Sequence, residues 1–260
     1  MQEDILAQLV KMSHNLGDPS LDYLILSEGN TSARADDRTF WVKASGTELR
    51  IIERADFVRV SFERVLSMLD VPSLSDAQVK QRLGEAKVDP STGAHPAADD
   101  DVRPSVETVL HAICLSLEGV NFVGHTHPTA INALTCSANF ETAVSGRLFP
   151  DEIVLCGPAP VVVPYIDPGV PLARKVRDLI NTYLDEFNEV PKIILMQNHG
   201  LIALGRNAQQ VENITAMAVK AARVLLGTYA LGGPRFMTPE AVGRIHTRPD
   251  ELYRRRLLGV

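Results

Sequence analysis

The chain has 260 residues, of which 45% are hydrophobic and 22% are charged, as in a globular protein with a full core. Its net charge of −6, from 26 basic and 32 acidic residues, argues against a nucleic-acid binder, which would carry a basic excess. The three cysteines include no C-x-x-C pair and form no even set for a disulfide framework. We therefore expect a reducing compartment, the cytoplasm, and no nucleic-acid partner.

The first residues include two acids and no apolar core of the signal-peptide type. No apolar run approaches the roughly 20 residues that cross a bilayer, so we expect no membrane partner. We interpret the basic run 254–256 as a solvated end. The sequence shows no repeat and no linker long enough to separate two domains, which predicts a single domain over 1–260.

The first third of the chain predicts a helix at 5–16 that Gly17 stops, and a polar loop at 27–34. Strands are predicted at 39–45 and 57–60, and a short helix at 61–69 capped by Ser61. Residues 71–103 are rich in proline and acids, and we interpret them as an excursion or lid on the domain. The next helix is predicted over 103–119, with Pro104 and Glu107 in its first turn.

Helices and short apolar strands alternate through the remaining sequence. Strands are predicted at 121–127, 152–155, 161–163 and 192–197. Helices are predicted at 128–137, 170–190 and 207–231, followed by a helical tail at 234–260. This alternation predicts a layered α/β domain with a central sheet.

His125 and His127 lie two residues apart at the end of a predicted strand, so both side chains face one side of the sheet and can reach one ion. Alone, such a pair is more often unremarkable than a metal site. His199 stands at the exit of another predicted strand, where it could instead be a turn residue bonded to a carbonyl. Glu107 could be a ligand, a general base or simply a first-turn acid, and His111 a partner of Glu107 or a surface residue.

Three histidines and a carboxylate suit Zn²⁺ or a similar divalent ion with an exchangeable position, which is a catalytic arrangement. Two loops of small residues, SEGNTS and ASGT, and the start of the helix near Ser105 could bind phosphate through backbone N–H groups. The chain has neither the P-loop nor the dinucleotide-binding glycine pattern.

The segments GNTSAR, KASGT, RPSVETVLHA, GHTHP and QNHGLIALG occur in this order. Together they resemble the class II aldolase/adducin family over about residues 5–230. The resemblance implies a three-layer α/β/α fold with a mainly antiparallel central sheet, and a homotetramer with sites between subunits. It also implies one divalent metal ion per subunit, Zn²⁺ first, with Mn²⁺, Co²⁺ or Ni²⁺ as alternatives.

The resemblance further implies which residues act. The implied metal ligands are His125, His127, His199 and Glu107, and Glu107 is also the implied catalytic acid/base. The implied phosphate-binding residues are Ser27, Gly29, Asn30, Ser45, Gly46 and Ser105. Val106 stands where the fuculose-phosphate enzymes have a second serine, which puts the need for a phosphate in question. Glu152 falls where rhamnulose-type aldolases carry a catalytic glutamate, and we assign it as a proton donor, with an exposed loop acid as the alternative.

The expected function is a metal-dependent aldolase that cleaves a ketose 1-phosphate to dihydroxyacetone phosphate and an aldehyde through a metal-stabilised enediolate. The implied substrates are of the fuculose, rhamnulose or deoxypentulose type. Lys43 is expected to be structural or to steer phosphate, because no lysine Schiff base is needed. Alternatives are a methylthioribulose-phosphate dehydratase, a sugar-acid aldolase or decarboxylase of the same family, and an adducin-like interaction module without catalysis.

Overall fold

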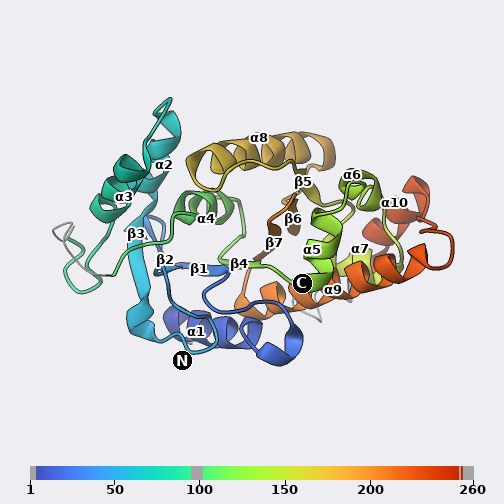
Figure 1. Ribbon diagram of the computed structural model, residues 1–260, viewed down its shortest axis with the longest axis horizontal. Coiled ribbons are helices and arrows are strands. Elements are labelled where there is room, and N and C mark those ends of the chain that lie inside the picture. The colour runs from blue at the N-terminus through green and yellow to red at the C-terminus, as the bar shows by residue number, and fades with distance from the viewer. Residues whose placement is uncertain (1–3, 95–101, 252, 254–260) are drawn as a thin grey trace.

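A central sheet organises the computed structural model, which describes residues 4–94, 102–251 and 253 (Figure 1). The described part of the chain contributes seven strands in the order β3-β2-β1-β4-β7-β6-β5. All neighbours pair antiparallel except β5 and β6, which confirms the expected mainly antiparallel sheet. The strands are β1 (Asn30–Arg34), β2 (Thr39–Lys43), β3 (Phe57–Ser61), β4 (Phe122–Thr126), β5 (Val161–Val163), β6 (Ile193–Met196) and β7 (Gly200–Gly205).

Helices cover both faces of the sheet and complete the three-layer α/β/α fold (Figure 1). On one face lie α4 and α8, and on the other lie α1 and α9. The α-helices in the described residues are α1 (Ile5–Leu16), α2 (Phe62–Leu66), α3 (Asp76–Glu85), α4 (Thr108–Leu115), α5 (Thr129–Thr135), α6 (Phe140–Ala143), α7 (Pro150–Cys156), α8 (Val170–Phe187), α9 (Ala208–Tyr229) and α10 (Pro239–Thr247). No described helix is long and apolar enough to cross a bilayer.

Alternation along the strands divides the apolar side chains between two cores. Val123 of β4 joins the core beneath α4 and α8, whereas Phe122 joins the core beneath α1 and α9. The same rule places His125 on the α4 side of β4, because it is two residues from Val123. The sheet therefore turns this histidine towards the helix that follows Glu107.

The prediction of a loop over 27–34 was wrong for its second half, because Asn30–Arg34 form strand β1 in the middle of the sheet. The small polar side chains concealed the strand, yet four of the five residues are buried. Their polar groups find partners on the flanking layers, as when the Thr31 and Ser13 hydroxyls hydrogen-bond at 2.7 Å. A polar strand is tolerated in a core when its side chains are hydrogen-bonded in this way.

The strand predicted at 152–155 was also wrong, because this segment is helix α7. Pro150 occupies its first turn, where a missing N–H costs nothing, and acids at 151 and 152 suit the positive end of the helix dipole. Helix α4 starts later than predicted, at Thr108, with Glu107 as the N-cap. Pro104 forms a β-bridge with Ala44 instead of opening the helix.

The segment 71–103 is more ordered than an excursion of loops, because it contains α3, which Ser75 and Gln78 close with a capping box. Residue Lys87 then bridges to Val60 and covers the edge of β3. The stretch 95–101 lies outside the described residues, and so does the basic run 254–256. Of the expected tail over 234–260, helix α10 is described, and it contacts α7.

Candidate active site

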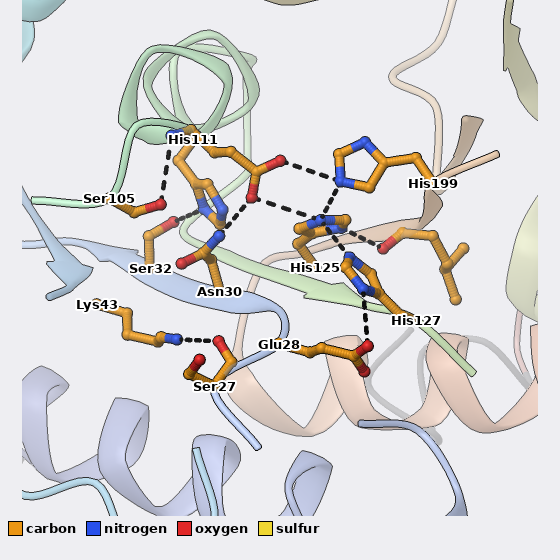
Figure 2. Close-up of polar contacts among 12 residues, drawn as sticks. Ser27, Glu28, Asn30, Ser32, Lys43, Ser105, His111, His125, His127 and His199 are labelled. Carbon is orange, nitrogen blue, oxygen red and sulfur yellow. Dashed lines mark hydrogen bonds and ion pairs between the residues drawn. The ribbon is translucent and has the colours of Figure 1, made fainter. Parts of the chain in front are cut away.

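Three histidines from two parts of the sheet meet at one end of β4 (Figure 2). His125 is the fourth residue of β4 and is fully buried, and His127 follows the strand end by one residue. His199 lies in the tight turn between β6 and β7, directly after Asn198, whose φ of 53° is left-handed. Because β7 pairs with β4, this turn brings the third imidazole to the other two.

The Nε2 atoms of the three rings converge. His125 Nε2 lies 3.0 Å from His127 Nε2 and 3.2 Å from His199 Nε2. A tetrahedral zinc site with bonds of about 2.0–2.1 Å has ligand–ligand edges of about 3.3 Å. The spacing of the imidazole nitrogens therefore fits a single divalent ion, and the structure brings together the three histidines that the sequence predicted as ligands.

The tautomer of His125 is set by its other ring nitrogen. Nδ1 lies 3.0 Å from the carbonyl oxygen of Leu201, which can only accept, so Nδ1 carries the proton and donates it. The Nε2 lone pair then points into the cluster, as a metal ligand requires. His127 has a weaker counterpart, because its Nδ1 lies 3.9 Å from the Glu28 carboxylate.

The Glu107 carboxylate closes the cluster from the α4 side. Its Oε1 lies 3.2 Å from His199 Nε2, and its Oε2 lies 3.5 Å from His125 Nε2 and accepts a 2.5 Å hydrogen bond from Asn30 Nδ2. Burial opposes its ionisation, but the neighbouring His125 and His199 more than offset burial and hold its pKa below the ordinary value. The group is therefore a carboxylate that can ligate a cation or accept a proton.

Burial favours the neutral form of His125 and His127. It lowers the pKa of His125 to about 4, and it lowers the pKa of His127 to about 3 together with the charge of His125. Imidazole binds metals in its neutral form, so the electrostatics agree with the geometry.

The first predicted phosphate loop runs directly beside the cluster. Ser27 is exposed, and its carbonyl accepts a 2.8 Å hydrogen bond from the buried Lys43 Nζ. Gly29 has a φ of 69°, and a Cβ there would stand 2.5 Å from the His125 carbonyl oxygen, so only glycine lets this loop pass β4. Asn30 is buried with its amide directed to Glu107 rather than outward.

The other two predicted phosphate elements lie side by side. Ser45 N–H donates to the Arg103 carbonyl at 2.8 Å, and Ser105 N–H donates to the Lys43 carbonyl at 3.3 Å. Gly46 is exposed, with a φ of 83° and open space around its α-carbon. Lys43 thus touches both the Ser27 loop and Ser105, and burial lowers its pKa to about 8 against the opposing charge of Glu107.

Glu152 lies outside the contacts of the histidine cluster. It sits on α7 with 6% of its surface exposed, so the alternative of an exposed loop acid was wrong. Its Oε1 forms a 3.0 Å ion pair with Arg147, and its Oε2 accepts a 2.8 Å hydrogen bond from the Leu148 N–H. The structure does not join this carboxylate to the histidine cluster, and its role as a proton donor stays a prediction.

Two supporting residues were missed or left open by the sequence. Ser32 was assigned to a loop, but its Oγ lies 2.6 Å from His111 Nδ1 (Figure 2). His111 is fully buried, which rules out a surface residue, and burial lowers its pKa to about 4. Recognising residues 30–34 as a strand would have predicted that Asn30 and Ser32 share one face.

Comparison with known proteins identifies the family of the chain. The family model of the class II aldolase and adducin N-terminal domain matches residues 7–226. A 3-oxo-tetronate 4-phosphate decarboxylase of Haemophilus influenzae is 25% identical over 95% of this chain and 97% of its own. A methylthioribulose-1-phosphate dehydratase of Geobacillus kaustophilus is 27% identical over 72% of this chain and 75% of its own.

A third relative is longer. The uncharacterized oxidoreductase YuxG of Bacillus subtilis is 27% identical over 70% of this chain, but the match spans only 24% of that protein. The name of that protein therefore refers to a chain about four times as long as the part that matches.

Solved structures share the fold. The N-terminal class II aldolase domain of a Thermoplasma acidophilum protein has 28% identity and a TM-score of 0.63, covering 87% of this chain and 95% of its own. An L-fuculose-1-phosphate aldolase of Thermus thermophilus has 18% identity and a TM-score of 0.60, covering 89% and 98%. The chain therefore belongs to the class II aldolase and adducin family.

Proposed function

We propose that the protein is a divalent-metal-dependent lyase that cleaves the C3–C4 bond of a ketose 1-phosphate and releases dihydroxyacetone phosphate and an aldehyde. The observation that carries the proposal is the convergence of three imidazole Nε2 atoms and the Glu107 carboxylate beside the Ser27 loop. Metal content after His125→Ala tests the ligand set, and full occupancy in that variant would reject it.

Different residues of the chain would bind the metal ion and transfer the proton. His125, His127 and His199 would hold the ion, with Zn²⁺ as the first candidate because imidazole and carboxylate both suit it. When bound, the ion supplies a Lewis acid that draws electron density from substrate oxygens. As the C3–C4 bond breaks, the C4 hydroxyl would lose its proton to solvent and C4 would become the aldehyde carbon. The electron pair of the broken bond would stay on C3, to which Glu107 would then deliver a proton. The Asn30 amide would keep the Glu107 carboxylate aimed at C3.

The two small-residue loops and the segment at Ser105 would bind the phosphate. Ser27, Gly29, Ser45, Gly46 and Ser105 offer hydroxyls and backbone groups on one side of the cluster. Lys43 would add a positive charge behind them, since its Nζ bonds to the Ser27 carbonyl. We also propose a homotetramer located in the cytoplasm, as the family resemblance and the cysteine content suggest.

A second candidate reaction is decarboxylation, or dehydration, of a related sugar acid or sugar phosphate at the same site. Val106 favours only the form of this reaction that acts on a sugar acid without a phosphate, because an apolar side chain, 54% exposed, stands beside Ser105 where a phosphate hydroxyl was expected. The decarboxylase and dehydratase relatives add support. In each reaction Glu107 would handle a proton at the carbon next to a carbonyl, and only the leaving group would differ.

The decisive experiment is a product screen on purified protein of measured metal content. Fuculose-, rhamnulose- and ribulose-1-phosphates, 5-deoxy analogues, 3-oxo-tetronate 4-phosphate and methylthioribulose 1-phosphate would each be offered. Release of dihydroxyacetone phosphate supports the aldolase. Release of CO₂ or loss of water without fragmentation assigns the second candidate, and no turnover with any of them would contradict both.

A further inference from the structure

Strand β1 and helix α4 are joined by a series of polar contacts at regular spacing. The series uses every second residue of β1 and every fourth residue from the start of α4. The contacts join Asn30 to Glu107 at 2.5 Å, Ser32 to His111 at 2.6 Å, and the Arg34 guanidinium to the backbone carbonyl of Leu115.

The two spacings agree physically. Two residues of a strand advance about 6.6 Å, and four residues of a helix advance about 6.0 Å. The three contacts can therefore form together only in one register of helix against strand. Sliding α4 by one turn along β1 would move each partner to a different rung and would leave a polar group at one end of the series without a partner.

The same strand also positions the histidines. Asn30 is the residue directly opposite His125 in the pairing of β1 with β4. β1 therefore sets the place of a histidine through the sheet and the place of Glu107 through α4. Glu107 is the N-cap of α4, so the position of its backbone follows that of the helix, while Asn30 holds its carboxylate directly.

Packing alone does not account for the middle contact. Ser32 and His111 are fully buried, and His111 Nε2 has no hydrogen-bond partner among the described residues. A buried polar atom without a partner costs about 1–3 kcal/mol, a cost that an aliphatic side chain at this place would avoid. The imidazole is retained in spite of this cost, with its Nδ1 on the Ser32 hydroxyl (Figure 2).

We propose that Ser32 and His111 are positioning residues, which hold α4 in register with β1 and thereby hold the Glu107 carboxylate against the histidine cluster. The inference rests on the proposed function, because it takes Glu107 and the three histidines as one metal site. Neither residue touches the substrate in this proposal; both act through Glu107.

The test is a double-mutant cycle on Zn²⁺ affinity, measured by chelator competition. Partners that orient metal ligands typically change affinity by about 10–100-fold, and we expect a loss in that range for Ser32→Ala. In the Glu107→Ala background the same substitution should change affinity by less than about twofold, because the residue through which Ser32 acts is then absent.

Three further variants separate positioning from general destabilisation. Cys114→Ala removes a buried group from α4 outside the series and should leave Zn²⁺ affinity within about twofold of wild type. Ser32→Thr keeps the hydroxyl and should restore the affinity lost in Ser32→Ala. His111→Asn keeps a polar group near the position of Nδ1, and should bind more tightly than His111→Leu.

The outcomes are distinct. Wild-type affinity in Ser32→Ala, or an equal loss with and without Glu107, overturns the positioning role while leaving the metal site intact. A wild-type protein that binds no divalent ion overturns the proposed function, and this inference with it.

Discussion

Two glutamates, Glu107 and Glu152, are almost equally buried, with 9% and 6% of their surfaces exposed, and the sequence predicted a catalytic role for both. Their surroundings differ. Glu152 faces the Arg147 guanidinium and a backbone N–H, so its charge and both of its oxygens have partners. Glu107 faces the Nε2 atoms of His125 and His199, and burial keeps His125 neutral above the acid range.

We interpret this difference as a prediction that Glu152 has a structural role and Glu107 a catalytic one. A buried carboxylate with a buried guanidinium is neutralised and needs nothing more. The Glu107 carboxylate lies against imidazoles instead of a guanidinium, and a divalent ion in the cluster would supply the positive partner. Burial alone therefore does not distinguish a catalytic carboxylate from a structural one, whereas the groups that contact the carboxylate do.

The largest effect expected from this comparison is on proton transfer. Glu107→Gln should lower the exchange of the C3 proton of dihydroxyacetone phosphate with solvent by about 10²–10⁴-fold, because an amide cannot serve as the acid/base. Proton NMR in D₂O measures this exchange. At saturating Zn²⁺ the metal should still be bound, since His125, His127 and His199 are unchanged. Glu152→Gln is the matched control, and undiminished exchange in Glu107→Gln would remove the assignment.

The next effect is on stability at the other glutamate. Glu152→Ala leaves the Arg147 charge buried and unpaired, with 4% of that side chain exposed, and should cost about 3–5 kcal/mol of unfolding free energy. Urea denaturation measures the loss, and Arg147→Met/Glu152→Leu should lose less than the single variant. If Glu152→Ala instead kept the full free energy of unfolding and no longer catalysed exchange of the C3 proton of dihydroxyacetone phosphate, Glu152 would be the catalytic glutamate and Glu107 the structural one.

The smallest expected effect is that the stability of the metal-free protein depends on pH through the histidine cluster. The pKa of His125 is lowered from 6.5 to about 4. Between these values the unfolded chain binds a proton that the folded chain does not, so the stability of metal-free protein should fall as pH decreases through this window.

Denaturation at a series of pH values tests this dependence. In the His125→Asn/His127→Asn variant the slope of stability against pH should be smaller. A slope that is the same in the variant and in the wild type would show that the histidine region does not govern the acid response.

Much of the fold was accessible from the sequence where apolar periodicity was strong. Helices α1, α8 and α9 and strands β2, β4 and β6 were predicted within a few residues of their observed bounds. The local pattern misleads at β1 and α7, and β7 (Gly200–Gly205) was not predicted as a strand. β1 is polar and buried, and α7 is a short apolar run that suits a strand or a helix equally.

The sequence alone determined that two histidines lie two residues apart on one strand and share a face, because alternation along a strand is a local rule. That these histidines act with His199 and Glu107 was implied by the family resemblance. Only the tertiary structure decided that Glu107 joins the histidines while Glu152 pairs with Arg147. That choice depends on which elements pack together, because the contacts of a buried charge lie far from it along the chain.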